Sequence, residues 1–378
     1  MEQRIFAVLF LTVFAAMLGV AIIGPLMPIY SKSLGATGIW LGVIFAMFPI
    51  ARTIFMPIIG KHSDKKGRKR YIWMGLFAYF IMSLGYAWSQ NVYELTIVRF
   101  LHGVASAMVL PIAMAYVAEI APKGKEGQHM GTFNMSLLLG LAIGPLIGGL
   151  LTEKFGISSS FYLMGFLAGI AMIMVLISLP DHNPSVKREY DVSFKDMLKD
   201  KRMRGIFTFR TVNAFGTGAV FVFLPIFAIG VHVSISQIGF LLSLVYLLMT
   251  VLQRPSGKLA DKFDKAGIIL FGSLGLSTAI IFVPKSHGFL GLLSISLLMA
   301  LFGSLSLPAA TAFVSELGRI HGMGATMGIF NVAMSVGFAT GPLVSGAIMD
   351  ILGLPYVFYF GGALGVLGSI VFYWMVKS

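Results

Sequence analysis

One charged segment reads Gly60-Lys-His-Ser-Asp64-Lys-Lys-Gly67-Arg68-Lys-Arg70, with six basic residues in eleven positions. Long apolar runs bound it on both sides, Leu41–Ile59 before it and Tyr71–Ala87 after it. A short charged loop between two such runs is typical of a membrane face, and its positive charge resists translocation across the bilayer. The segment therefore predicts a membrane protein with this loop on the cytoplasmic side.

Composition points to the same class of protein. The chain has 378 residues, 57% of them hydrophobic and 11% charged, and its mean hydropathy is +0.89. Soluble domains carry about 25% charged residues, so this chain needs a bilayer as its solvent. The apolar runs are long enough for helical spans and lack the alternation of membrane β-strands. We expect an all-α membrane protein with twelve spans, near residues 5–30, 38–59, 71–89, 93–117, 129–151, 158–179, 205–231, 235–254, 267–283, 289–314, 323–350 and 354–376.

The net charge of +13 is distributed unevenly along the chain. Of the 28 Lys and Arg residues, three lie in loops opposite the basic segment (Lys32, Lys154 and Lys285), three lie inside spans, and the other 22 lie on the side of the basic segment. This pattern places both chain ends in the cytoplasm and favours contact with anionic membrane lipids, not nucleic acid. We expect an integral protein of the cytoplasmic membrane.

Several other kinds of site lack a signature in the sequence. The chain has no cysteine, which excludes disulfides and thiolate metal sites. It has no Walker sequence for ATP, and neither a Ser/His/Asp set nor a metal-ligand spacing stands out. We therefore expect no enzymatic activity, no cofactor and no metal. The first apolar run exceeds a signal-peptide core and lacks a cleavage site, so we expect it to remain as a span.

The chain repeats itself at a fixed offset. Gly60, Lys61, Asp64 and Lys65 recur 197 residues later as Gly257, Lys258, Asp261 and Lys262. The same offset maps Gly42, Pro111, Glu119, Gly131, Asn134, Gly140, Gly144, Pro145 and Gly149 onto Gly239, Pro308, Glu316, Gly328, Asn331, Gly337, Gly341, Pro342 and Gly346. With six spans in each copy, the two copies have the same orientation, which favours a substrate site at their interface near the middle of the bilayer.

This duplication predicts three parts of the chain. We expect a six-helix bundle over residues 1–180, a cytoplasmic linker over 181–204 and a second six-helix bundle over 205–378. In the linker, Phe194, Met197 and Leu198 fall on one helical face, which indicates a short amphipathic helix on the membrane surface.

On these residues the chain resembles the major facilitator superfamily from end to end. The segment from Gly60 to Arg70 is similar to the loop between the second and third spans of that family, G-x-x-x-D-x-x-G-R-[KR]-[KR]. Arg99-x-x-x-Gly103 is similar to the fourth-span motif, with His102 where an amide is usual. Leu18-Gly19, Pro25 and Pro28 resemble the first-span motif of twelve-span drug:proton antiporters, and Gly140-x-x-x-Gly144-Pro145-x-x-Gly148-Gly149 resembles the fifth-span motif associated with exporters.

The resemblance implies a conformational latch at the cytoplasmic face. Asp64 would lie against the start of the eleventh span, and Arg68 would pair with Glu119 at the inner end of the fourth. The latch residues are Gly60, Asp64, Gly67, Arg68 and Glu119, with Asp261 and Glu316 as weaker copies. Alternatively, these charges only anchor loops to lipid headgroups. The small residues of the fifth and eleventh spans form a packing face that also slides between the halves: Gly140, Gly144, Pro145, Gly148, Gly149, Gly341 and Pro342.

Ionisable groups inside spans are costly and are therefore candidates for function. Arg99, His102 and Ser106 form one polar stripe, Arg210, Asn213 and Thr217 a second, and Tyr246, Thr250 and Gln253 a third. Against a role in transport, Arg99 can cap carbonyls of the broken first span, His102 can simply bond to a neighbouring helix, and Arg52 and Arg210 can reach the inner face. The candidate substrate and proton pathway comprises Arg52, Arg99, His102, Arg210, Asn213, Tyr246, Gln253, Asn134 and Asn331, of which the two asparagines can instead join helices.

Our main interpretation is a monomeric secondary transporter that exports small amphiphilic molecules, in exchange for protons. One alternative is an uncoupled exporter of organic anions or sugar-like metabolites, and another is a membrane receptor that does not transport. All fifteen Asp and Glu residues lie in loops or near span ends, whereas three Arg and one His lie at depth. The sequence therefore favours an anionic or neutral substrate over a cationic one.

Overall fold

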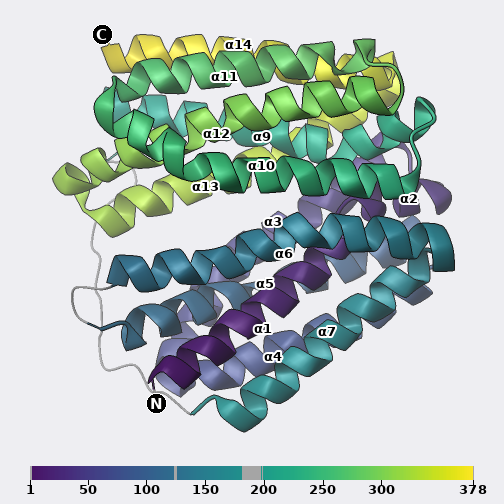
Figure 1. Cartoon of the computed structure of the whole chain (residues 1–378), viewed down its shortest axis with the longest axis vertical. Coiled ribbons are helices and arrows are strands. Elements are labelled where there is room, and N and C mark those ends of the chain that lie inside the picture. The colour runs from purple at the N-terminus through teal and green to yellow at the C-terminus, as the bar shows by residue number, and fades with distance from the viewer. Residues whose placement is uncertain (1, 123–125, 181–196, 198, 378) are drawn as a thin grey trace. The chain divides into compact units, whose positions relative to one another are not determined.

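The computed structural model describes residues 2–122, 126–180, 197 and 199–377 (Figure 1). These residues are helical, with no strand among them, and twelve of their helices are long and apolar enough to cross a membrane. This confirms the predicted all-α fold. The helices of the first repeat are α1 (Glu2–Ile23), α2 (Leu26–Ser33), α3 (Gly38–Lys66), α4 (Arg68–Trp88), α5 (Val92–Ile120), α6 (Glu126–Phe155) and α7 (Ile157–Ser178).

The second repeat has the same order of long helices. It comprises α9 (Lys201–Gly230), α10 (Ile235–Lys262), α11 (Lys265–Phe282), the 3-10 turn η1 (Val283–Lys285), α12 (Gly288–His321), α13 (Met323–Leu352) and α14 (Leu354–Lys377). The predicted linker helix depends on Phe194 and Leu198, which lie outside the described residues.

The first span is broken into α1 and α2. Pro25 precedes α2, and because proline has no backbone N–H it cannot continue the hydrogen-bond ladder of α1. α2 is then tied down by Tyr30, whose hydroxyl donates to the carbonyl oxygens of Tyr86 (2.9 Å) and Ser89 (2.7 Å) at the end of α4. Pro25 of the first-span motif thus marks the break between α1 and α2.

The described helices group into two compact units. The first unit contains Met1–Ala36, Met47–Val186 and Ser234–Ser243, and the second contains Thr37–Ala46, Lys187–Val233 and Leu244–Ser378. Two helices are divided between the units, because the first turns of α3 belong to the second unit and the first turns of α10 belong to the first. These two starting segments are at repeat-equivalent positions.

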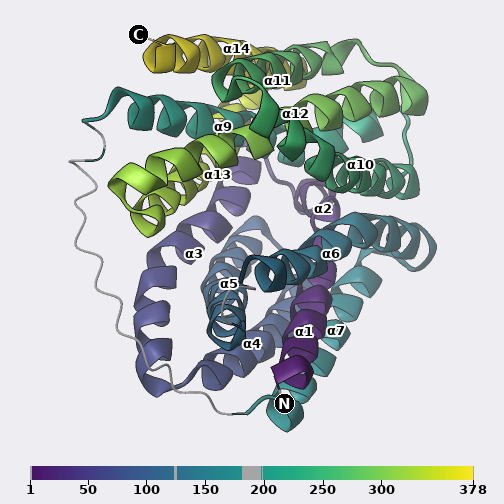
Figure 2. The same ribbon diagram turned by 60° about the vertical axis from the view of Figure 1, so that its left-hand side comes forward.

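Packing within each unit follows the repeat. In the first unit α1 lies against α6 and α7, and α4 lies against α5 and α7 (Figures 1 and 2). In the second unit the equivalent pairs pack together, α9 against α13 and α14, and α11 against α12 and α14. The two copies detected at an offset of 197 residues therefore share one packing pattern as well as one sequence pattern.

Candidate functional site

His102 on α5 lies in a closed aromatic cluster of the first unit, which we call the His102 cluster and which consists of Phe48, Tyr79, Tyr86 and His102. The imidazole is fully buried, and its Nδ1 lies 2.8 Å from the hydroxyl of Tyr86. Its ring centroid is 4.5 Å from that of Tyr79 and 5.1 Å from that of Phe48. Nε2 has no hydrogen-bond partner among the described residues. The cluster leaves one imidazole nitrogen available for a proton or a water.

Two arginines of the candidate pathway, Arg99 and Arg52, lie in the same unit as the His102 cluster. Arg99, one turn before His102, is buried, and its guanidinium carbon is 5.4 Å from the centroid of Phe48. Gly103 allows this arrangement, because a β-carbon added there would lie 2.9 Å from the β-carbon of Ala51 on α3. Arg52 on α3 is partly buried and has neither a hydrogen bond nor an ion pair with any described residue. Arg99 thus lies beside aromatic residues of the His102 cluster, and Tyr86 is one of its hydrogen-bond partners.

Arg210 occupies a similar environment in the second unit. Its Nη2 donates to the sulfur of Met334 (2.8 Å), and its guanidinium carbon lies 4.7 Å from the ring centroid of Phe330 on α13. Its Nε has no partner among the described residues. A soft thioether and an aromatic face hold this cation without neutralising it.

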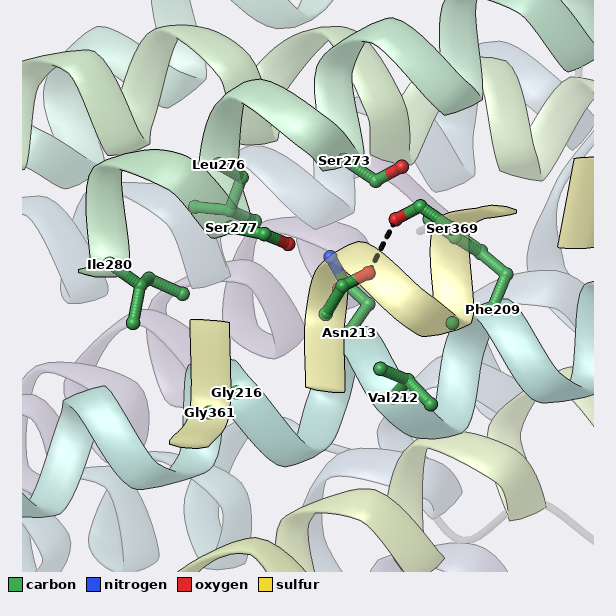
Figure 3. A pocket seen from close by; sticks show the side chains of 12 residues that line it. Phe209, Val212, Asn213, Gly216, Ser273, Leu276, Ser277, Ile280, Gly361 and Ser369 are labelled. Carbon is green, nitrogen blue, oxygen red and sulfur yellow. Dashed lines mark hydrogen bonds between the residues drawn. The ribbon is translucent and has the colours of Figure 1, made fainter. Parts of the chain in front are cut away.

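The second polar stripe does not converge on one place. Asn213, one turn after Arg210, lines a pocket between α9, α11 and α14 that has a volume of about 310 Å³, including its open mouth. Figure 3 shows Asn213, Ser277 and Ser369 at this pocket, where Ser369 donates to the carbonyl oxygen of Gly365 (2.7 Å). Arg210 instead contacts α13. The i, i+3 spacing predicts one polar stripe, but the two residues meet different helices.

The remaining pathway candidates have few polar contacts. Tyr246 is partly buried, and its carbonyl oxygen accepts from the hydroxyl of Thr250 (2.7 Å) within α10. Gln253, Asn134 and Asn331 are exposed, and their side chains make no hydrogen bond to any described residue. They are open to solvent, lipid or substrate.

At the basic segment, Arg68 joins three helix ends. Its Nε donates to Oε2 of Glu119 (2.8 Å), its Nη2 donates to the other carboxylate oxygen, and Nη2 also lies 2.9 Å from Oδ1 of Asp64. The guanidinium is buried, whereas Asp64 is exposed. Gly67, with φ of +88°, makes the tight turn between α3 and α4 that brings Arg68 to this position. Gly60 lies within α3, with no atom within 4 Å of an added β-carbon.

The second repeat carries a simpler version of this contact. Lys265 stands where the first repeat has Arg68, and its Nζ lies 2.9 Å from Oε1 of Glu316. Asp264 begins α11 by accepting from the N–H of Gly267 (3.1 Å) and pairs with Lys377 (3.1 Å). Slight burial acts to raise the pKa of the Asp264 carboxyl, but its bonds to Lys377 and to backbone N–H groups outweigh this and lower it. Asp261 is exposed and makes no ion pair with a described residue.

The glycines of α6 face two helices in the first unit. β-Carbons added at Gly140 and Gly144 would lie 2.8 Å from the nitrogen of Leu18 and 2.5 Å from the β-carbon of Ala21, both on α1. One added at Gly148 would meet the carbonyl oxygen of Ile22. Gly149 instead faces the first turn of α10. The motif therefore keeps α6 in backbone contact with α1 and with α10.

The second repeat copies these contacts. A β-carbon added at Gly341 would lie 3.0 Å from the α-carbon of Phe215 on α9. The carbonyl oxygen of Pro342 lies 2.6 Å from a β-carbon added at Gly42 in the first turns of α3. As in the first repeat, one helix uses small residues to contact two neighbours.

In the sequence, Glu153 and Asp350 are two of the carboxylates that lie in loops or near span ends, and no role was assigned to either. The two residues accept hydrogen bonds from the starts of α10 and α3. The repeat offset was the available signal, because it maps one acidic residue onto the other.

Comparisons with known proteins show the family of this chain. The model of the Major Facilitator Superfamily matches residues 9–231 and 206–378. An uncharacterized MFS-type transporter of Methanocaldococcus jannaschii is 34% identical over 100% of this chain and 99% of its own length. The multidrug resistance protein MdtG of Proteus mirabilis is 28% identical over 94% of this chain and 92% of its own.

A solved structure shares the fold. It is a bacterial homologue of the human lysosomal transporter Spinster, with a TM-score of 0.85 and 13% identity over 100% of this chain and 97% of that one. At this identity the likeness concerns the fold alone. Together with the family match over both repeats and the twelve membrane helices, it leads to one conclusion: the chain belongs to the Major Facilitator Superfamily and is an integral membrane transporter of that family.

Proposed function

We propose that this chain is a secondary active exporter of small amphiphilic molecules that works by alternating access in exchange for protons. Three features support export as the direction of transport. They are the glycine motif of α6, the first-span motif that resembles that of drug:proton antiporters, and a relative named for multidrug resistance. In this proposal Asp64, Arg68 and Glu119 stabilise one conformation at the basic face, with Asp64 engaging the start of α13. The two bundles, residues 1–180 and 205–378, move as the alternating parts.

The proposed orientation places both chain ends in the cytoplasm of a monomer in the cytoplasmic membrane. It rests on the 22 basic residues that the sequence predicts on one side of the membrane. Ser33, exposed at the end of α2, would then face the exterior. On intact cells, an impermeant thiol reagent should label Ser33→Cys, and absence of labelling would reverse the orientation.

The observation that carries the substrate class is the environment of Arg210. Its contacts are the sulfur of Met334 and the ring of Phe330, neither of which cancels its charge. No carboxylate of the chain lies near the middle of a span. A site with an arginine whose charge is not cancelled repels cations, and a low dielectric strengthens this repulsion. Anionic or neutral amphiphiles are therefore the proposed substrates, and an exporter of organic anions is the alternative that the same observation favours.

Flux of matched anionic, neutral and cationic probes in proteoliposomes tests the substrate class. We expect the anionic probe to move at least about tenfold faster than the cationic one, the ratio that a difference of about 1.4 kcal/mol in barrier produces. Arg210→Gln should slow the anionic probe more than the neutral one, whereas Lys285→Gln, in a loop, should slow neither. Faster transport of the cationic probe by the unmodified chain would refute the charge argument.

A further inference from the structure

Two carboxylates, each near the end of one helix, accept hydrogen bonds from the first backbone N–H groups of another helix. Both contacts lie at the helix ends that are far from the basic segment. In the second unit, the backbone N–H groups of Gly38 and Ile39 donate to Oδ1 (2.6 Å) and Oδ2 (2.8 Å) of Asp350. Gly38 and Ile39 begin α3, and Asp350 lies near the end of α13. In the first unit, the N–H of Ser236 near the start of α10 donates to Oε2 of Glu153 (2.8 Å), near the end of α6.

These two contacts are copies of one another. The offset of 197 residues maps Ile39 onto Ser236 and Glu153 onto Asp350. In both contacts, a carboxylate near the end of a glycine-rich helix (α6 or α13) accepts from the first turn of the second long helix of the other repeat (α10 or α3). We refer to them as the Asp350 cap and the Glu153 cap. Their occurrence twice, in two separate compact units, argues against a chance arrangement of one exposed side chain.

Close backbone contacts surround each cap. In the second unit, a β-carbon added at Gly42 would lie 2.6 Å from the carbonyl oxygen of Pro342. In the first unit, one added at Gly149 would lie 2.8 Å from the carbonyl oxygen of Ile235, and one at Gly239 would meet the carbonyl oxygen of Pro145. These contacts require that α3 touches α13 and that α6 touches α10. Each cap is therefore formed, and stabilises the structure, when the two helix ends are in contact.

The physical basis of each cap is the unpaired start of a helix. The first N–H groups of a helix have no partner within it, and the helix dipole favours a negative charge there. A carboxylate satisfies both conditions. Because Glu153 and Asp350 are exposed, water can replace their contacts, so the caps are weak enough to break during a transport cycle.

We propose that Glu153 and Asp350 are positioning residues of the transport cycle, which hold the starts of α10 and α3 closed and release them when this end of the transporter opens. The proposal rests on the proposed function in assuming that these ends part during transport and that they face the exterior. It predicts that loss of either carboxylate shifts the population toward the state that is open at this end. A purely local helix cap would leave that population unchanged.

The absence of native cysteine allows a direct test. Ala46 is fully buried and lies about 12 Å further along α3 than Gly38, so we expect Ala46→Cys to react only when this part of α3 becomes exposed. Ser243→Cys is the repeat-equivalent reporter for α10, and its sulfur keeps an acceptor for the N–H of Leu146. Labelling of each reporter by an impermeant maleimide is measured on intact cells, with exposed Ser33→Cys as the fully accessible reference.

We expect Asp350→Ala to raise the labelling rate of Ala46→Cys about fivefold, the change that loss of a typical helix cap produces in an equilibrium. Glu153→Ala should do the same for Ser243→Cys. Asp350→Glu and Glu153→Asp, which keep the acceptor and the charge, should restore slow labelling at least in part. If an alanine variant fails to reach the membrane, the labelling rate is measured in Asp350→Asn and Glu153→Gln instead, because these variants remove the charge but keep the side-chain volume.

Glu94→Ala is the matched control. Its carboxylate lies in the first turn of α5 and, among the described residues, accepts hydrogen bonds only from the nearby N–H of Gln90 (2.9 Å) and the amide of Asn91 (2.7 Å). Labelling in both cap variants at the rate found with Glu94→Ala would overturn the proposal. Because labelling needs no substrate and no proton gradient, this outcome is independent of whether the proposed substrate class or coupling ion is correct.

Discussion

Transport is expected to fall by about tenfold or more in Gly148→Leu, because a side chain at this position has no space. Its β-carbon would meet the carbonyl oxygen of Ile22 and lie 3.2 Å from the α-carbon of the same residue. These are backbone atoms of α1, which cannot rotate away. Overpacking costs about 1–3 kcal/mol where side chains can adjust, and contact with backbone should place this variant at the upper end. Gly341→Leu should reduce transport similarly, because its side chain would meet the backbone of Phe215 on α9.

Two glycines on the same helices provide controls for this result. Gly131 on α6 and Gly328 on α13 are exposed, and an added β-carbon would meet no atom within 4 Å. Gly131→Leu and Gly328→Leu should therefore transport at close to the unmodified rate. The measurement is probe flux per mole of protein in proteoliposomes, with folding checked by size-exclusion chromatography. Equal flux in Gly148→Leu and Gly131→Leu would show that α6 and α1 do not need this backbone contact.

Arg68→Ala should produce the second large effect, a loss of both stability and transport. Removing one partner of a buried ion pair leaves the other charge uncompensated, at a cost of about 3–5 kcal/mol. Glu119 retains 27% exposure, so solvent lowers the expected loss to about 2 kcal/mol. Arg68→Lys should recover only part of it, because an ammonium group cannot reproduce the bidentate contact. Melting temperature in detergent and probe flux are the two readouts.

The second repeat contains the matched control for Arg68. Lys265 makes a single contact with Glu316, whose side chain is 55% exposed. Exposed pairs contribute about 0–1 kcal/mol, so Lys265→Ala should change the melting temperature little. If Arg68→Ala and Lys265→Ala lower the melting temperature equally, the buried guanidinium has no special role in the latch.

The sequence was sufficient to predict the fold. Twelve apolar runs, the basic segment and the repeat offset gave the helices, and Pro25 marked the break between α1 and α2. The contact between Arg68 and Glu119 was also expected, although through resemblance, since these residues are far apart in the chain. Apolar length and charge placement act locally, along the chain, and this is why they can be read without a structure.

Side-chain neighbours were harder to predict. Spacing placed Arg210 and Asn213 on one stripe, yet Arg210 contacts Met334 on α13 while Asn213 faces α11 and α14. Helical periodicity gives the direction of a side chain but does not identify the helix that it meets. The Glu153 and Asp350 caps were missed because a carboxylate near a span end has an obvious role as a solvated charge. Their acceptor role depends on N–H groups of another helix.

Proton-driven uptake into everted membrane vesicles tests the proposed exchange most directly. With the lumen acidified and the membrane potential clamped to zero, the unmodified chain should concentrate the preferred probe inside, and an ionophore that removes the pH difference should abolish this. His102→Gln should move the probe only down its gradient, whereas Tyr86→Phe, which removes the hydroxyl at Nδ1 but keeps the imidazole, should remain driven. Identical uptake by the unmodified chain with and without the pH gradient would contradict proton exchange.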